Sequence, residues 1–128
     1  MAKEIVQFPN LKVLLVEDYF INQEVTVDML QMLGCQVDVA EEGLQGVKMA
    51  EENFYDLIIM DLQLPGIDGL EATKRIRANE LPGKHSIIIA LTANALEGDR
   101  ETCLKIGMED YISKPMEFFT LEEKLRKY

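Results

Sequence analysis

Short apolar runs rich in β-branched residues alternate along the chain with longer stretches of helical character. There are five such runs: Leu11–Val16, Cys35–Ala40, Leu57–Met60, Ile87–Leu91 and the very short Tyr111–Ile112. Runs of this kind predict β-strands. Because each predicted strand is followed by a helical stretch, the pattern indicates a parallel sheet with helices on both of its faces.

The stretches between the runs have the spacing of helices. One apolar stripe recurs every fourth residue between the first two runs: Ile21, Val25, Met29 and Leu33. Gly34 follows this stripe and Gly107 follows a later stretch, both at positions typical of a helix end. Four further helices are expected, over Leu44–Glu52, Gly69–Ala78, Gly98–Ile106 and Phe118–Lys127.

The hydrophobic pattern of the runs also indicates their order in the sheet. The first, third and fourth runs are continuously apolar, as expected of strands covered on both faces. The second run alternates, with Gln36 and Asp38 between apolar residues, and the fifth is short, so both suit sheet edges. This predicts a doubly wound, flavodoxin-like (βα)5 fold with strand order 2-1-3-4-5. We expect one α/β domain over residues 10–128, preceded by an N-terminal arm over residues 1–9.

Polar side chains stand where the predicted strands end. Glu17 and Asp18 follow the first run, Asp61 the third, Thr92 the fourth, and Lys114 comes shortly after the fifth. In the order 2-1-3-4-5, a crevice opens at the carboxyl ends of strands one and three. We therefore expect three carboxylates, a hydroxyl and an ammonium group to gather in one crevice.

Three neighbouring carboxylates repel one another unless a cation is bound between them. Oxygen ligands without a nearby His or Cys favour Mg²⁺, or alternatively Mn²⁺. Lys114 can neutralise a phosphoryl oxygen and Thr92 can donate a hydrogen bond to another. Together with Asp61 as a carboxylate nucleophile, these groups are the parts of an in-line phosphoryl transfer.

Each of these residues also has a simpler structural explanation. Asp18 could cap the following helix, and Asp61 precedes a turn-forming Leu-Gln-Leu-Pro-Gly segment. Thr92 fits an ordinary strand residue and Lys114 a solvated loop lysine. Tyr111, on sequence alone, fits a half-buried aromatic at an edge strand. The coincidence of several such residues at one sheet edge is what favours a functional site.

Composition narrows the class of function. The chain has 23 acidic and 13 basic residues and a formal net charge of −10, which disfavours binding to nucleic acid or to an anionic membrane. No apolar run approaches the ~20 residues that span a bilayer, and the first eight residues lack the apolar core of a secretion signal. Cys35 and Cys103 are expected to be buried free thiols of a reducing cytoplasm rather than a disulfide. His85 is expected at the surface, not as a phosphodonor.

Four segments together resemble the receiver domains of two-component response regulators. They are Val-Glu-Asp at 16–18, Met-Asp-Leu-Gln-Leu-Pro-Gly-Ile-Asp-Gly at 60–69, Ala-Leu-Thr-Ala at 90–93 and Tyr-Ile-Ser-Lys-Pro at 111–115. Each segment is weak evidence alone, but their order and spacing are specific. The resemblance extends from about Leu11 to Arg126.

The resemblance implies a role for each matching residue. Asp61 would be the phosphoacceptor, and it would bind Mg²⁺ together with the acidic pair Glu17 and Asp18. The backbone carbonyl of Gln63 would complete the metal site. Thr92 would be the switch hydroxyl, Lys114 the lysine that contacts the phosphoryl group, and Tyr111 the aromatic that turns inward on activation. A cis peptide bond is implied between Lys114 and Pro115.

A closer likeness is to the receivers of hybrid sensor histidine kinases, carried by Asn22-Gln23, Gly69-Leu-Glu-Ala-Thr, Thr92-Ala-Asn-Ala and Gly98-Asp-Arg. Such receivers take phosphate from a histidine kinase and pass it to a histidine phosphotransfer protein. This implies a cytoplasmic regulator, not an enzyme, that promotes its own phosphorylation and slow autodephosphorylation. As a monomer or weak dimer, it would switch the binding of a downstream protein through the face formed by its fourth helix, fifth strand and fifth helix. Tyr19 departs from the Asn usual in that subfamily, at a position that bears on partner access or phosphoryl lifetime.

Three alternatives stay open on sequence alone. A flavodoxin-like module binding FMN would need a phosphate loop rich in Ser, Thr or Gly after the first strand, where Glu17 and Asp18 stand. A metal-dependent aspartyl phosphatase would usually place its nucleophile on the first strand and need a covering cap, for which 128 residues leave little room. A receiver-like interaction domain without phosphorylation would keep the same fold, although the complete set of site residues argues against it.

Overall fold

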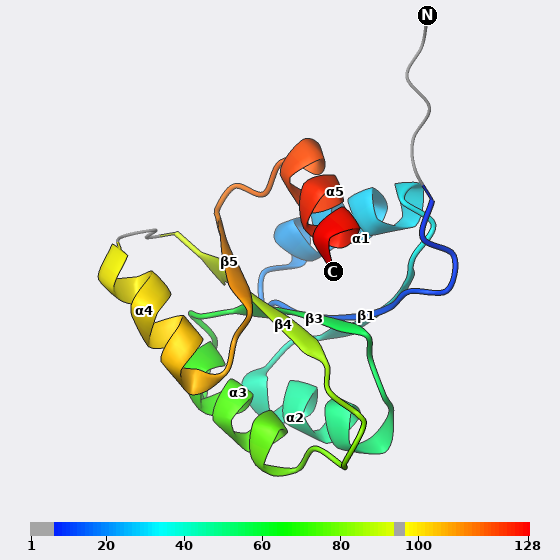
Figure 1. Cartoon of the computed structure of the whole chain (residues 1–128). Coiled ribbons are helices and arrows are strands. Elements are labelled where there is room, and N and C mark those ends of the chain that lie inside the picture. The colour runs from blue at the N-terminus through cyan, green and yellow to red at the C-terminus, as the bar shows by residue number, and fades with distance from the viewer. Residues whose placement is uncertain (1–6, 94–96) are drawn as a thin grey trace, which may run out of the picture.

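Five parallel strands form a single sheet with helices on both faces (Figure 1). This computed structural model describes residues 7–93 and 97–128, so most of the predicted arm over residues 1–9 lies outside the described residues. The strands are β1 (Lys12–Val16), β2 (Gln36–Ala40), β3 (Leu57–Asp61), β4 (Ile87–Thr92) and β5 (Asp110–Ser113). Their order is β2-β1-β3-β4-β5, which confirms the predicted doubly wound arrangement.

The helices form two layers. On one face of the sheet lie α1 (Phe20–Met32) and α5 (Phe118–Lys127), and on the other lie α2 (Gly43–Glu52), α3 (Gly69–Ala78) and α4 (Glu97–Ile106) (Figure 1). Successive residues of a strand point to opposite faces, so Ile58 packs with the second group of helices and Ile59 with the first. Both are fully buried, which explains why the central strands are continuously apolar.

The edge strands differ from the central ones as their sequences predicted. In β2, Gln36 and Asp38 are exposed while Val37 and Val39 are half-buried. In β3, every residue is buried. The alternation of the second run is therefore the signature of a strand covered on one side only. Among the described residues, no helix is long and apolar enough to cross a membrane.

Helix α1 forms where the apolar stripe predicts a helix, but the stripe does not coincide with its buried face. Of the four residues in the predicted stripe, Leu33 is buried and Met29 half-buried, whereas Ile21 and Val25 are 54% and 51% exposed. A spacing of four residues advances about 40° beyond one full turn at each step, so the stripe winds around the helix. The residues of α1 that face the interior are Gln23, Thr26 and Leu30.

Both helix ends predicted from glycine have the expected geometry. Gly34 follows α1 with φ +81° and Gly107 follows α4 with φ +113°, a region that residues with a Cβ rarely adopt. The residue after each glycine donates its N–H to a carbonyl five residues earlier, Cys35 to Leu30 and Met108 to Cys103, both over 3.0 Å. These bonds close the last turn of each helix and direct the chain into the next strand.

Candidate functional site

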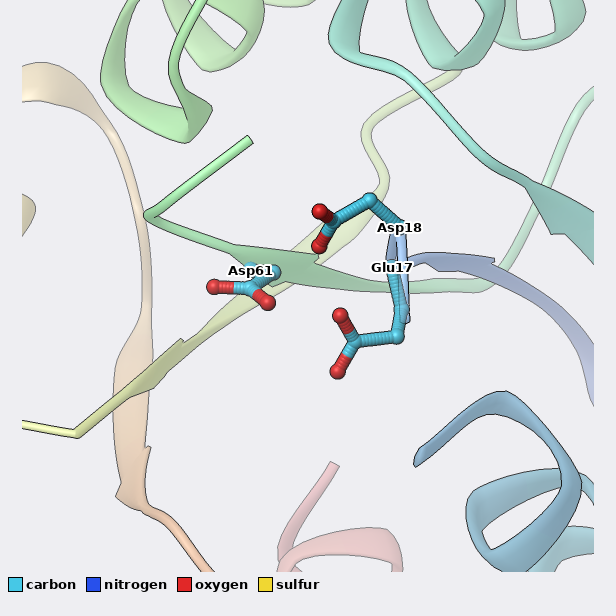
Figure 2. Close-up of side chains that lie close together, drawn as sticks. All are labelled: Glu17, Asp18 and Asp61. Carbon is cyan, nitrogen blue, oxygen red and sulfur yellow. The ribbon is translucent and has the colours of Figure 1, made fainter. Parts of the chain in front are cut away.

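Three carboxylates meet at the carboxyl ends of β1 and β3. Glu17, Asp18 and Asp61 each offer one oxygen, and these oxygens all lie within 4.8 Å of one another. Figure 2 shows the three side chains lying close together at the ends of the two strands. Glu17 and Asp61 are each 1% exposed, while Asp18 is exposed at the mouth of the crevice. The sheet brings them together because β1 pairs directly with β3, with Val16 opposite Met60.

One ammonium group lies in the same crevice. Lys114 Nζ is 2.6 Å from Asp61 Oδ2 and 3.6 Å from Glu17 Oε1. The lysine follows β5, and its backbone N–H donates to the carbonyl of Thr92 over 2.8 Å, which ties it to the end of β4. The peptide bond between Lys114 and Pro115 is cis, as the resemblance implied.

The crevice holds more negative than positive charge. Burial first, and then the hydrogen bond and negative charge of Asp61, raise the pKa of Glu17 from 4.5 to about 7. Burial works against the charge on Lys114, but its hydrogen bond with Asp61 and the charge of that carboxylate outweigh burial and raise the lysine pKa. A single ammonium cannot balance three carboxylates, so a hard divalent cation with oxygen ligands fits this donor set.

The loop after β3 holds Asp61 by backbone contacts. The N–H of Gln63 donates to Asp61 Oδ1 over 2.9 Å. Gly69, which begins α3, lies so close that an added Cβ would come within 2.2 Å of the carbonyl oxygen of Asp61. Asp68 caps α3 by accepting the N–H of Glu71 over 2.8 Å. The position of Asp61 therefore depends on a glycine at position 69. The metal-binding role of the Gln63 carbonyl stays a prediction.

The turn from β1 into α1 has no helix cap from a side chain. Tyr19 is the N-cap residue, and Asp18 does not cap the helix, so the capping explanation of Asp18 was wrong. Instead, the side chain of Gln23 donates from Nε2 to the carbonyl oxygen of Glu17 over 2.6 Å. In the sequence, Gln23 was noted only as part of the resemblance to receivers of hybrid histidine kinases, with no role in the site. Gln23 is only 8% exposed, which is unusual for Gln, and this burial draws attention to its bond with Glu17.

Thr92 and Tyr111 lie on the two strands beyond Asp61. Thr92 ends β4 and is 7% exposed, and in β5 Tyr111 pairs with Ala90, two residues before Thr92. Tyr111 is half-buried, with the guanidinium of Arg100 in α4 5.8 Å from its ring centre. It lines a groove of about 580 Å³ along α4, β5 and α5. Their switching roles stay predictions.

The remaining residues named from sequence lie apart from the crevice. His85 stands just before β4, at the opposite end of the sheet from Asp61, and its side chain is 56% exposed. Its ring nitrogens lie within 3.3 Å of Glu80 and 2.8 Å of Glu109. Cys35 and Cys103 are buried and free, as predicted. The carboxylate crevice is thus separate from the single histidine of the chain.

Comparison with known proteins places this site in a family. Residues 13–126 match the response regulator receiver domain. The chain is 41% identical, over 98% of its length, to hybrid signal transduction histidine kinase G of Dictyostelium discoideum. It is 40% identical, over 94% of its length, to the aerobic respiration control sensor protein ArcB of Escherichia coli. It spans only 4% and 15% of these two proteins, respectively.

Solved structures share the fold of this chain. The receiver domain of the sensor histidine kinase PA1611 from Pseudomonas aeruginosa, which has magnesium coordinated in its active-site cleft, is 48% identical with a TM-score of 0.84. The match covers 92% of this chain and 96% of that domain. The receiver domain of Ssk1 from Saccharomyces cerevisiae, crystallised with the histidine phosphotransfer protein Ypd1, gives 34% identity and a TM-score of 0.86, over 94% and 90% of the two chains.

The chain belongs to the response regulator receiver family, and it is a receiver domain of two-component phosphorelay signalling. This membership sets aside the flavin-binding and phosphatase alternatives. The third alternative, a receiver that has lost phosphorylation, depends on the chemistry of Asp61.

Proposed function

We propose that Asp61 accepts a phosphoryl group from a phosphohistidine of a partner protein. In this step a carboxylate oxygen of Asp61 forms the new P–O bond, the P–N bond to the histidine breaks, and the imidazole leaves with the electron pair. The observation that carries the proposal is the joint placement of three carboxylate oxygens within 4.8 Å and of Lys114 Nζ at 2.6 Å from Asp61. The ammonium neutralises charge that would otherwise repel the incoming phosphoryl group.

Glu17, Asp18 and Asp61 would hold Mg²⁺, with the Gln63 carbonyl as a further ligand. When bound, the ion supplies positive charge against the phosphoryl oxygens. Lys114 orients one oxygen of the attacking carboxylate, and the Gln63 N–H holds the other. Thr92 contributes a hydroxyl at the end of the adjacent strand, which supports its role as a donor to the phosphoryl group.

Phosphorylation with a small phosphodonor tests this proposal directly. In the presence of Mg²⁺, phosphoramidate should add one hydroxylamine-labile phosphoryl group to the wild-type chain, because acyl phosphates react with hydroxylamine. Asp61→Asn should abolish the labelling. Asp68→Asn is the matched control, because Asp68 lies in the same loop but caps α3 by accepting the Glu71 N–H. Equal labelling of wild type and Asp61→Asn would contradict the proposal.

A partner must bring its phosphohistidine to the mouth of this crevice. Exposed apolar side chains surround the start of α1 beside that mouth: Tyr19, Phe20, Ile21 and Val25, which are 51–64% exposed. A groove of about 370 Å³ runs from Val25 past Glu17 to Pro115 and Met116. Apolar surface gathered around a polar site is typical of protein interfaces. We assign this surface, the α1 rim, to a histidine kinase or a histidine phosphotransfer protein.

The output of the domain is proposed to be a change in its α4-β5-α5 face. Tyr111 supports this, because it stands three residues before Lys114 and its side chain lines the groove on that face. New contacts from the phosphoryl group to Thr92 and Lys114 would bias Tyr111 toward its inward position, and a downstream protein would detect the altered face. Phosphorylation should therefore shift the NMR resonances of β5 and α5, and Asp61→Asn should remove that shift. The buried free cysteines are in keeping with a cytoplasmic location.

A further inference from the structure

Gln23 connects helix α1 to the acidic pair of the crevice. The residue lies in the first turn of α1 and is 8% exposed. Its side-chain Nε2 donates to the carbonyl oxygen of Glu17 over 2.6 Å, and its backbone N–H donates to the carbonyl of Tyr19 over 3.0 Å. Through these two bonds, one residue of the helix holds the turn that follows β1 at two points.

The carbonyl that Gln23 holds has a special position. It belongs to the peptide group that joins Glu17 to Asp18, the two consecutive acidic residues of the site. The orientation of this peptide plane decides the directions in which the two side chains leave the backbone. On the other side of Glu17, the backbone N–H donates to Ala40 in β2 over 3.0 Å. With both bonds present, the backbone of Glu17 is fixed from both ends.

Little else in the turn can replace the bond from Gln23. The N-cap residue Tyr19 makes no side-chain cap, and its N–H bonds to the Glu17 carboxylate over a longer distance, 3.3 Å. That carboxylate is itself a candidate metal ligand, so it is not an independent support. A flexible peptide between Glu17 and Asp18 would let their mutually repelling carboxylates move apart.

We propose that Gln23 is a positioning residue of the metal site, which fixes the Glu17–Asp18 peptide so that both carboxylates stay directed at one cation. This inference rests on the proposed function, because it assumes that the cluster binds Mg²⁺. Gln23 does not touch the ion or the phosphoryl group. It raises the affinity for Mg²⁺ by keeping the ligands in place before the ion arrives, as partners of metal ligands do in other sites.

Gln23→Met tests the inference, because Met has a similar shape but cannot donate a hydrogen bond. The matched control is Ser86→Ala, which also removes a buried donor to a backbone carbonyl, the 2.7 Å bond from Ser86 Oγ to Tyr55, at the opposite end of the sheet. The chain has no Trp, so Mg²⁺ binding is best measured by isothermal titration calorimetry at pH 8. Urea unfolding, followed by circular dichroism, gives the stability of each variant.

The expected result is a dissociation constant for Mg²⁺ about 3- to 30-fold higher in Gln23→Met than in wild type, with Ser86→Ala unchanged. Both variants should lose stability. If Gln23→Met binds Mg²⁺ as tightly as wild type, or if Ser86→Ala weakens binding equally, the positioning role is wrong and Gln23 serves the fold alone. If the wild-type chain itself binds no Mg²⁺, the proposed metal site fails, which is a different outcome from failure of the inference.

Discussion

The ammonium of Lys114 and the carboxylate of Asp61 lie 2.6 Å apart, although 53 positions separate them in the chain. Asp61 is 1% exposed, so its charge has little access to water. Lys114 therefore serves two purposes in the free domain. It compensates a buried negative charge, and it keeps a cation at the place where a phosphoryl group would arrive.

Replacing Lys114 by Met should lower both the stability of the domain and its rate of phosphorylation. We expect the free energy of unfolding to fall by about 1–3 kcal/mol, because Asp61 loses its paired charge. Phosphorylation by phosphoramidate should slow by about 100-fold, because the charge near the phosphoryl oxygens is lost. Urea unfolding and the rate of hydroxylamine-labile phosphate incorporation measure the two effects.

Lys124→Met provides the matched control for this prediction. Lys124 Nζ donates to the buried carboxylate of Asp110 over 2.8 Å, away from the crevice. Burial works against ionisation of Asp110, but the hydrogen bonds from Lys124 and from the Tyr111 N–H outweigh it and lower its pKa. The control should lose comparable stability and keep its phosphorylation rate. A slow phosphorylation in both variants would show that Lys114 acts only through stability.

The raised pKa of Glu17 predicts that Mg²⁺ binding depends on pH. In the folded domain this pKa is about 7, against 4.5 for an ordinary glutamate, so the protonated form is favoured by folding. The stability from this group is present below pH 4.5 and is lost as the pH rises through about 7. Mg²⁺ requires the ionised form, so its affinity should fall by up to about tenfold per pH unit below 7.

Thermal unfolding with and without Mg²⁺ at pH 6 and pH 8 measures this coupling. The increase in Tm caused by Mg²⁺ should be larger at pH 8 than at pH 6. Glu17→Gln should bind Mg²⁺ more weakly and lose most of this difference, because its side chain does not titrate. An equal increase in Tm at both pH values in wild type would mean that Glu17 is already ionised at pH 6 or does not bind the ion.

A methyl group at Gly69 should disturb the phosphoacceptor without touching its side chain. Its Cβ would lie 2.2 Å from the Asp61 carbonyl oxygen and 2.9 Å from Leu62 Cα, so the backbone must move. We expect Gly69→Ala to lower stability by about 2 kcal/mol and to slow phosphorylation. Gly66→Ala, in the same loop, is the control: at φ +75° with no neighbour within 4 Å, it should cost about 1 kcal/mol and leave phosphorylation intact. Normal phosphorylation in Gly69→Ala would contradict the expectation.

The exposed residues of the α1 rim should matter for a protein donor and not for a small one. Ile21→Ser and Val25→Ser should slow transfer from phosphorylated histidine phosphotransfer domains by about five- to tenfold, because apolar contacts at the centre of an interface are lost. Labelling by phosphoramidate should be unchanged. Met32→Ser, equally exposed at 52% but at the other end of α1, is the control. Equal transfer rates in all three variants would exclude this surface as the docking site.

Sequence alone predicted the fold because the burial of each strand determines which of its residues are apolar. Leu57–Met60 had to be apolar on both faces, and Gln36 and Asp38 could face water only at an edge. The orientation of α1 was not readable in the same way. Its apolar residues serve two surfaces, with Leu33 in the core and Ile21 exposed on the rim, and periodicity does not distinguish a core from an interface.

The composition of the crevice was predictable because parallel strands end at one edge of a sheet, which brings Glu17 and Asp61 together. Contacts between side chains and the backbone could not be predicted in this way. The bond from Gln23 to the Glu17 carbonyl depends on the rotation of α1, which the sequence did not reveal. The close approach of Gly69 to Asp61 likewise requires the path of the loop after β3.

Chemical mapping of the phosphorylated residue tests the central proposal most directly. Borohydride reduces an acyl phosphate to an alcohol, so phosphorylated Asp61 would be converted to homoserine and identified by peptide mass spectrometry. We predict homoserine at position 61 after treatment with phosphoramidate and Mg²⁺, and none when Mg²⁺ is removed. Unreduced Asp61, with the phosphoryl group found at Asp18, His85 or another residue, would contradict it.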